Sequence, residues 1–370
     1  MIIGIDASRA AYPQRTGTEN YSLFLIRALV DLDTEHRFRL YFNLAPQDGL
    51  FAAERAELRT IPFPRLWTHV RLSLEMATCR PDVLFVPAHV LPLIHPQNSV
   101  VTVHDLGYIC YPEAHTSWDR RYLRWATQYN ARCARCVIAD SQATKRDLVE
   151  YCGTAADKIQ VIYPGYDRAF AAVHDLSCLE AVRRRYGLPD AYAIHVGTLH
   201  PRKNLTTLLD AFAVVAPQHG DLHLALVGKR GWLYEPLFAQ VQRLGLEDRV
   251  HFTGYVPHDE LPALLTAARL FLLPSLYEGF GLPVLEAMAC GTPVICSNVS
   301  SLPEVVGDAA ILVDPRDLSA WIEALERVLD DERLRATLAR KGLRQVARFS
   351  WEQCAEQTLA VLEASAADAH

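Results

Sequence analysis

The sequence lacks the motifs that mark several common classes of enzyme. No GxGxxG follows the first predicted strand of either half, P-loop spacing is missing, and no GxSxG elbow occurs. The usual signatures of dinucleotide binding, P-loop phosphate binding and serine hydrolysis are therefore missing. The sequence shows no DxD-like carboxylate cluster that suggests a metal site, and no second CxxC pair accompanies the first. We therefore expect neither a metal nor a cofactor.

Composition argues against two further classes. No apolar run approaches the ~20 residues that a membrane-spanning helix needs, and a net charge of −6 gives no support for bulk nucleic-acid binding.

The nine cysteines are odd in number and scattered, which favours reduced thiols and a cytoplasmic protein. The N-terminus is expected to form a strand rather than a signal peptide. The single CxxC, at 133–136, is interpreted as free helical cysteines rather than a metal or redox site.

The length of 370 residues predicts two domains. In both halves, short apolar runs alternate with helical patterns, which is typical of parallel sheets covered by helices. We therefore predict an α/β fold of two doubly wound, Rossmann-like domains whose parallel sheets face an interdomain cleft. The first domain is expected over 1–170 and is completed by a last helix at about 351–370, and the second is expected over 171–350. The predicted strands are 2–7, 39–44, 83–88, 100–104, 137–140 and 159–163, then 193–196, 222–227, 250–253, 270–273, 294–296 and 311–313. The predicted helices include 20–32, 142–151, 205–216, 260–267 and a region from about 318.

The most informative run is 278–295, which begins Glu-Gly-Phe-Gly-Leu-Pro-Val-Leu-Glu. It follows a buried strand and predicts a glycine loop and a short helix, with Glu278 above the carboxyl end of the strand, where open α/β sheets bind ligands. Glu286 is expected in the first helical turn, leaning toward the same crevice. Carboxylates accept hydrogen bonds from hydroxyls, so the pair suits a sugar and a ribose. The structural alternative is a capping and a helix-stabilising carboxylate.

A second group follows the first strand of the second half. Gly197 opens a loop that leads through Arg202 and Lys203 into a helix. A helix N-terminus with two cations beside it suits a diphosphate, since Arg can bind two oxygens and Lys adds a point charge. A solvated surface pair is the alternative. A further basic turn, at 228–231, fits either a position near phosphates or an ordinary loop.

The first half offers weaker candidates. His104 ends a buried strand and is expected to contact ligand, with Asp105 orienting its ring or capping the next turn. Gly17, Thr18 and Glu19 precede a predicted helix. Gly17 could present its N–H to a phosphate and Thr18 or Glu19 could face an acceptor, although Thr18 also fits an N-cap.

One predicted helix combines aromatic and basic residues. Aromatic residues recur at 118, 122, 125 and 129, on one helical face, and five arginines lie in the same segment. This pattern fits either an interfacial helix that touches anionic lipid or a packed aromatic stripe with solvated arginines.

Together these motifs resemble the retaining glycosyltransferases of family 4, which have the GT-B fold. The resemblance rests on the 278–293 run, Gly197 with Arg202-Lys203, His104-Asp105 and Gly17, and it spans nearly the whole chain. It implies that Glu278 contacts the donor sugar, that Glu286 contacts the nucleotide ribose, and that His104 lies beside the transferred sugar. The donor site is expected to include Gly17, Gly197, Gly279, Phe280, Gly281 and Leu282. Many members carry paired glycines after the first strand, whereas only Gly17 precedes Thr18 in this chain.

The resemblance also implies an activity. It is the metal-free transfer of a hexose from a nucleotide-sugar, with retention of configuration, to a saccharide or a polyprenyl-diphosphate-linked oligosaccharide at the inner membrane face. Within the family the chain is similar to bacterial mannosyl- and rhamnosyltransferases of surface-polysaccharide assembly, which points to GDP-mannose. The alternatives are a sugar-nucleotide epimerase of the same architecture and a non-catalytic homologue that only binds nucleotide-sugar.

Overall fold

The computed structural model describes residues 1–367 except 13, 53, 89, 113–115, 232 and 233. It divides into an N-terminal unit, Met1–Gly165 with the segment from Phe349, and a C-terminal unit, Tyr166–Arg348. The sequence predicts the break after residue 170. Residues 166–170 belong to the C-terminal unit because Asp167 Oδ2 lies 2.9 Å from His258 Nε2 and the buried Phe170 ring packs on His258.

The described part of the N-terminal unit contains a seven-stranded parallel sheet in the order β3-β2-β1-β4-β5-β6-β7. The strands β1, β4, β5 and β6 are mainly apolar, as expected when both faces of a parallel sheet are covered. The strands are β1 (Ile2–Asp6), β2 (Arg37–Phe42), β3 (Ala56–Thr60), β4 (Val83–Val86), β5 (Ser99–Val103), β6 (Cys136–Ala139) and β7 (Ile159–Val161).

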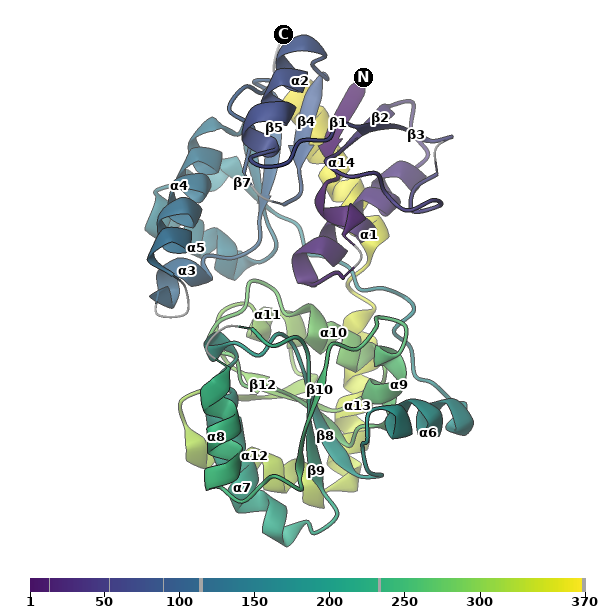
Figure 1. Ribbon diagram of the computed structural model, residues 1–370, viewed down its shortest axis with the longest axis vertical. Coiled ribbons are helices and arrows are strands. Elements are labelled where there is room, and N and C mark those ends of the chain that lie inside the picture. The colour runs from purple at the N-terminus through teal and green to yellow at the C-terminus, as the bar shows by residue number, and fades with distance from the viewer. Residues whose placement is uncertain (13, 53, 89, 113–115, 232–233, 368–370) are drawn as a thin grey trace. The chain divides into compact units, whose positions relative to one another are not determined.

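Helices cover both faces of this sheet. The helix α1 (Gly17–Asp31) and the C-terminal helix α14 (Trp351–Ala367) bury one face, and α4 (Ser117–Cys133) and α5 (Gln142–Cys152) lie over the other, as Figure 1 shows. Further elements in the described part of the unit are η1 (Arg9–Ala11), the π-helical turn η2 (Thr68–Leu72), α2 (Ser73–Thr78), α3 (Gly107–Cys110) and η4 (Ala156–Lys158).

The described part of the C-terminal unit contains a six-stranded parallel sheet in the order β10-β9-β8-β11-β12-β13. This order places β8 and β11 side by side, so the loops that follow them leave the same edge of the sheet. The strands are β8 (Tyr192–Val196), β9 (His223–Val227), β10 (Val250–Gly254), β11 (Leu270–Leu273), β12 (Val294–Ser297) and β13 (Ala310–Val313).

Both faces of the second sheet are also covered. The helices α7, α8 and α12 bury one face around Phe212 and Trp321, whereas α10 packs on α13, where Gly342 allows close approach to Met288 (Figure 1). The helical elements are α6 (Leu176–Arg185), η5 (Pro201–Lys203), α7 (Leu205–Val215), η6 (Ala216–Gln218), α8 (Glu235–Arg243), α9 (Leu261–Ala267), α10 (Leu282–Ala289), α11 (Leu302–Val306), α12 (Leu318–Asp330) and α13 (Glu332–Val346).

The predicted alternation of strands and helices is confirmed, although some element ends differ, such as β2 at 37–42 rather than 39–44. Two differences have a clear cause. The edge strand β3 was missed because its sequence, Ala-Glu-Leu-Arg-Thr, contains no apolar run. The helix α1 begins at residue 17 rather than 20, because the Glu19 carboxylate accepts a 3.0 Å hydrogen bond from the Thr16 amide and closes a capping box.

Candidate active site

A buried ion pair lies where two neighbouring strands of the C-terminal unit end. Lys203, from the turn that follows β8, places its Nζ 2.5 Å from Oε1 of Glu278, which follows β11. The Ser275 hydroxyl donates a second hydrogen bond of 2.5 Å to the same carboxylate oxygen. Both charged side chains are almost fully buried, at 12% exposed for Lys203 and 9% for Glu278. The predicted association of the glutamate with the basic turn is therefore present.

The charges beside Glu278 keep it ionised. Burial alone would raise the pKa of this carboxyl, but Lys203 and Arg202 outweigh it and hold the pKa below its ordinary value. The Arg202 guanidinium lies 6.0 Å from the centre of the Tyr277 ring, and the Arg202 carbonyl accepts a 2.8 Å hydrogen bond from the Leu276 amide. The turn at 202–203 and the loop at 276–278 thus pack together, with two cations beside one carboxylate.

The glycine loop that carries Glu278 is held by two serines that the sequence did not single out. Ser300 Oγ accepts a 2.9 Å hydrogen bond from the Glu278 amide, and Ser301 Oγ donates to the carbonyls of Glu278 (3.0 Å) and Phe280 (2.9 Å). Gly281 has a φ of +105°, and a Cβ there would lie 2.7 Å from Leu302 Cδ2. Gly279 and Phe280 are buried, and Leu282 begins α10. The loop is therefore fixed before any ligand arrives.

The predicted phosphate loop lies against the basic turn of the next strand. The Leu199 amide donates to the Lys229 carbonyl (2.9 Å), and the Gly231 amide donates to the Leu199 carbonyl (3.1 Å). A Cβ on Gly228 would lie 2.0 Å from the Gly197 carbonyl oxygen, so only glycine permits this approach. The basic turn at 228–231, which the sequence left open, is thus directly beside the loop at 197–199.

His195 is a further site residue that sequence reasoning missed. It lies fully buried on β8, its Nδ1 is 2.9 Å from the Leu272 carbonyl, and its buried Nε2 has no hydrogen-bond partner. Burial, with Lys203 nearby, lowers the pKa of His195 to about 4. This imidazole is therefore neutral at physiological pH, with Nδ1 as its donor. A histidine in the middle of an apolar strand was the available signal.

Glu286 does not share the environment of Glu278. It lies in the second turn of α10 rather than the first, because the helix begins at Leu282. Burial raises its pKa to about 7, the charge of His258 opposes this rise, and that of Asp167 adds to it. The charges that act on Glu286 thus come from the His258–Asp167 pair, whereas those that act on Glu278 come from Lys203 and Arg202.

In the N-terminal unit, His104 follows β5 and is oriented by a residue that follows β6. Its Nδ1 lies 2.6 Å from Asp140 Oδ2, and its ring packs edge-on against Tyr21 at 4.7 Å. Burial would lower the pKa of His104, but the Asp140 carboxylate, together with smaller effects of Asp105 and the Pro87 carbonyl, raises it. Nε2 is buried and makes no hydrogen bond of ordinary geometry, although the Pro87 carbonyl also favours the protonated ring. Of the two roles expected for Asp105, turn capping is seen, since it accepts a 2.8 Å hydrogen bond from the Gly107 amide.

The residues at the start of α1 have structural partners. Thr16 rather than Thr18 is the N-cap, so the predicted capping role of Thr18 is wrong. Glu19 closes the capping box and lies 3.1 Å from Arg9 Nη1. Gly17 is the first helical residue, and a Cβ there would meet no heavy atom within 4 Å. Steric crowding therefore does not explain glycine at position 17.

Two parallel-sheet α/β units with this loop at the end of β11 define a glycosyltransferase of the GT-B fold. Residues 180–345 match the family described as "Glycosyl transferases group 1", and residues 15–170 match "Glycosyltransferase Family 4". The chain belongs to glycosyltransferase family 4, so both the predicted family and the predicted fold class are confirmed.

Relatives and a solved structure agree with this assignment. The chain is 36% identical over 265 residues to the O-antigen chain mannosyltransferase B of Escherichia coli, covering 71% of this chain and 69% of that protein. It is 30% identical over 268 residues to the serotype-specific mannosyltransferase WbdA of Escherichia coli, covering 70% of this chain but only 32% of that relative. The crystal structure of Anabaena HepE in complex with UDP and glucose has a TM-score of 0.75 at 24% identity and covers 98% of this chain and 99% of that one.

Proposed function

We propose that this glycosyltransferase moves mannose from GDP-mannose to a saccharide acceptor, with retention of the anomeric configuration and without a bound metal. The observation that carries the proposal is the buried Lys203–Glu278 ion pair at the ends of β8 and β11, with Arg202 beside it. It offers two cations to a diphosphate and a fixed carboxylate to sugar hydroxyls. The mannosyltransferase names of two relatives support mannose as the sugar.

In the proposed reaction the acceptor hydroxyl attacks the anomeric carbon of the donor. The bond from that carbon to the diphosphate oxygen breaks, and its electron pair leaves with the diphosphate. The acceptor proton passes to the leaving phosphate. Lys203 and Arg202 stabilise the negative charge that develops on the diphosphate, which is where preorganised cations lower a barrier. Glu278 holds the donor sugar, and Glu286 accepts hydrogen bonds from the ribose.

The residues of the N-terminal unit complete the proposal. Asp140 fixes the orientation of the His104 ring, and His104 is proposed to lie beside the transferred sugar, as the resemblance to the family implies. We assign a lipid-linked oligosaccharide as the acceptor and the cytoplasmic face of the membrane as the place of reaction, following the O-antigen name of the first relative. Among the described residues, no helix has the length and apolar character to span a bilayer.

The test is an assay of the purified full chain with GDP-mannose, UDP-glucose and other nucleotide-sugars, with and without mannose-terminated acceptors. The expected result is release of GDP only when acceptor is present, with an α-linked product by NMR, since GDP-mannose is α-configured. Conversion of the nucleotide-sugar without acceptor would instead identify an epimerase. Nucleotide-sugar binding without transfer to any acceptor would identify a non-catalytic homologue.

A further inference from the structure

Large apolar side chains gather on one surface of the N-terminal unit. The segment around η2 and α2 exposes Leu66, Val70 and Leu74, and α4 exposes Trp118, Tyr122 and Trp125. Trp118 is 79% exposed and Leu66 is 67% exposed. A loop between them adds the exposed residues 93 and 94. Contiguous exposed apolar surface of this kind marks a site of interaction.

Direct contacts join these segments into one surface. His69, from η2, lies 3.1 Å from the Tyr122 hydroxyl, and its ring packs on Trp125 at 5.5 Å. Tyr129 stacks on Trp125 and donates a 3.1 Å hydrogen bond to the Pro92 carbonyl. The amides of residues 93 and 94 both donate to Ser73 Oγ, at 2.9 and 3.3 Å. We call the surface formed by η2, α2, the loop at 92–94 and α4, with the arginines of these segments, the aromatic–arginine surface.

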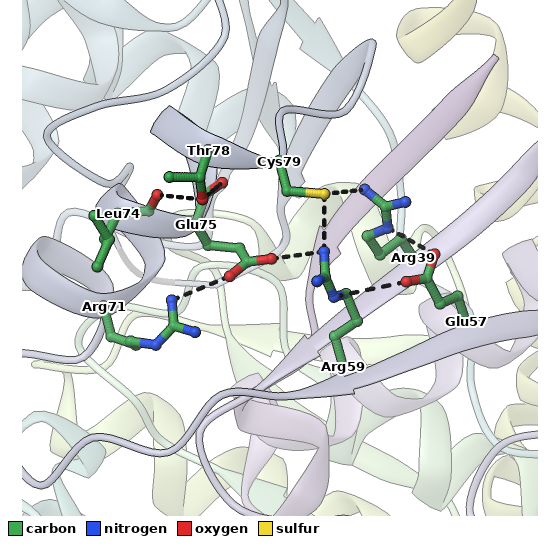
Figure 2. A network of polar contacts seen from close by, with 8 residues as sticks. All are labelled: Arg39, Glu57, Arg59, Arg71, Leu74, Glu75, Thr78 and Cys79. Atoms are coloured by element: carbon green, nitrogen blue, oxygen red, sulfur yellow. Dashed lines mark hydrogen bonds and ion pairs between the residues drawn. The ribbon is translucent and has the colours of Figure 1, made fainter.

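The exposure of these side chains is built into the fold. Glu75, next to the exposed Leu74, is buried between Arg59 of β3 (2.6 Å) and Arg71 of η2 (3.1 Å). Cys79 accepts a further 3.0 Å hydrogen bond from Arg59, as Figure 2 shows. This network fixes one side of α2 to the sheet, while the Leu74 side chain is 56% exposed.

The charge of the aromatic–arginine surface is opposite to that of the whole chain. Stretches 63–75 and 117–125 contain five arginines (65, 71, 120, 121 and 124) and two carboxylates, the buried Glu75, which pairs with Arg71, and the exposed Asp119, whereas the net charge of the chain is −6. Arginines interleaved with tryptophan, tyrosine and leucine match the headgroup region of an anionic bilayer. A second copy of the chain fits poorly, because two such surfaces face to face would repel each other.

We propose that the aromatic–arginine surface docks on bilayers that contain anionic phospholipid. Trp118 and its apolar neighbours enter the headgroup region, and the arginines contact lipid phosphates. The biological use of this docking rests on the proposed function, because a lipid-linked acceptor lies at a membrane surface. The docking itself requires neither donor nor acceptor.

The experiment is co-sedimentation of the full chain with vesicles of phosphatidylcholine alone or mixed with phosphatidylglycerol. We expect binding only to the mixed vesicles, with release at high salt. Trp118→Ser with Trp125→Ser should weaken binding about tenfold or more, because interfacial affinity scales with buried apolar area. Arg120→Glu with Arg121→Glu should abolish the preference for anionic vesicles. Leu176→Ser, which alters an equally exposed residue of the C-terminal unit (77%), should bind like wild type.

Three outcomes would overturn the proposal. The first is that the wild-type protein does not bind anionic vesicles, and the second is that the tryptophan variant binds them as well as wild type does. The third is that the wild-type protein binds no vesicles but forms a dimer, which Trp118→Ser dissociates. Circular dichroism establishes that each variant is folded, and Trp118→Ser alone suffices if the double variant is not. Transfer to a water-soluble acceptor should be unchanged in these variants. Loss of transfer with intact vesicle binding would count against the proposed function only.

Discussion

Lys203 and Glu278 are 75 positions apart in sequence, yet Nζ of one lies 2.5 Å from Oε1 of the other in the interior of the C-terminal unit. Adjacent placement of β8 and β11 makes this contact possible. A bound diphosphate would compete with Glu278 for Lys203. Replacing either residue should therefore change both the stability of the C-terminal unit and the proposed transfer activity. The change in stability and the change in activity can be measured separately.

The ion pair predicts a large coupling in stability. Breaking a buried pair by removing one partner costs about 3–5 kcal/mol, because an uncompensated charge stays buried. Lys203→Met and Glu278→Gln should each lower the free energy of unfolding strongly, and the double variant should lose much less than their sum. Urea unfolding measures this cycle. The exposed pair Lys341–Asp308 (2.8 Å) is the matched control and should show little coupling; equal coupling in both cycles would contradict the interpretation.

Loss of Lys203 should also slow transfer. Hydrogen bonds to charged groups contribute about 1.5–3 kcal/mol, so Lys203→Ala should reduce kcat/KM by about tenfold to a hundredfold. Glu278→Gln should abolish most turnover while the protein still binds GDP, because the amide preserves the shape but not the charge. Steady-state assays and calorimetric titration with GDP separate these effects. Wild-type turnover by Glu278→Gln would exclude the proposed role of Glu278.

Asp140 should control the protonation of His104. Because Asp140 raises the pKa of His104, Asp140→Asn should lower it. The raised pKa stabilises the fold below the ordinary value of 6.5, and this contribution is lost as pH rises through the folded-state pKa. The variant should therefore lose most stability in acid. NMR titration of the imidazole measures the shift, and Asp105→Asn, which removes a weaker charge effect, should change the pKa less.

Glu286 should make unliganded protein less stable as pH rises. Burial raises its folded-state pKa from 4.5 to about 7, so the neutral form stabilises the fold below about 4.5 and this contribution is lost as pH rises through about 7. Glu286→Gln should thus raise the melting temperature by a few degrees at alkaline pH and by less in acid. The exposed Glu247→Gln is the control. An equal effect at both pH values would show that Glu286 is not buried as a carboxylic acid.

Removal of divalent metal should not reduce transfer. Arg202 and Lys203 already provide two fixed positive charges beside Glu278, so the departing diphosphate needs no Mg²⁺. Initial rates should be the same after treatment with EDTA as after addition of Mg²⁺. A rate that falls with EDTA and recovers with Mg²⁺ would show that the cationic pair is insufficient.

Local patterns in the sequence predicted much of the C-terminal unit. The buried run at 270–273, the glycines around Glu278 and the proline at the start of α10 act over a few residues, so they can be recognised without knowing the fold. The Thr16–Glu19 capping box was an equally local signal, and overlooking it misplaced the start of α1. The edge strand β3 gave no comparable apolar pattern.

The sequence by itself determined two α/β units and the side chains that end their strands, because hydrophobic periodicity and turn residues act over short distances. Only the tertiary structure decided the partners: Asp140 for His104, Ser300 and Ser301 for the glycine loop, and Asp167 with His258 beside Glu286. Strand order and burial determine which charges meet and how strongly they interact, and neither is encoded in the spacing of any single motif.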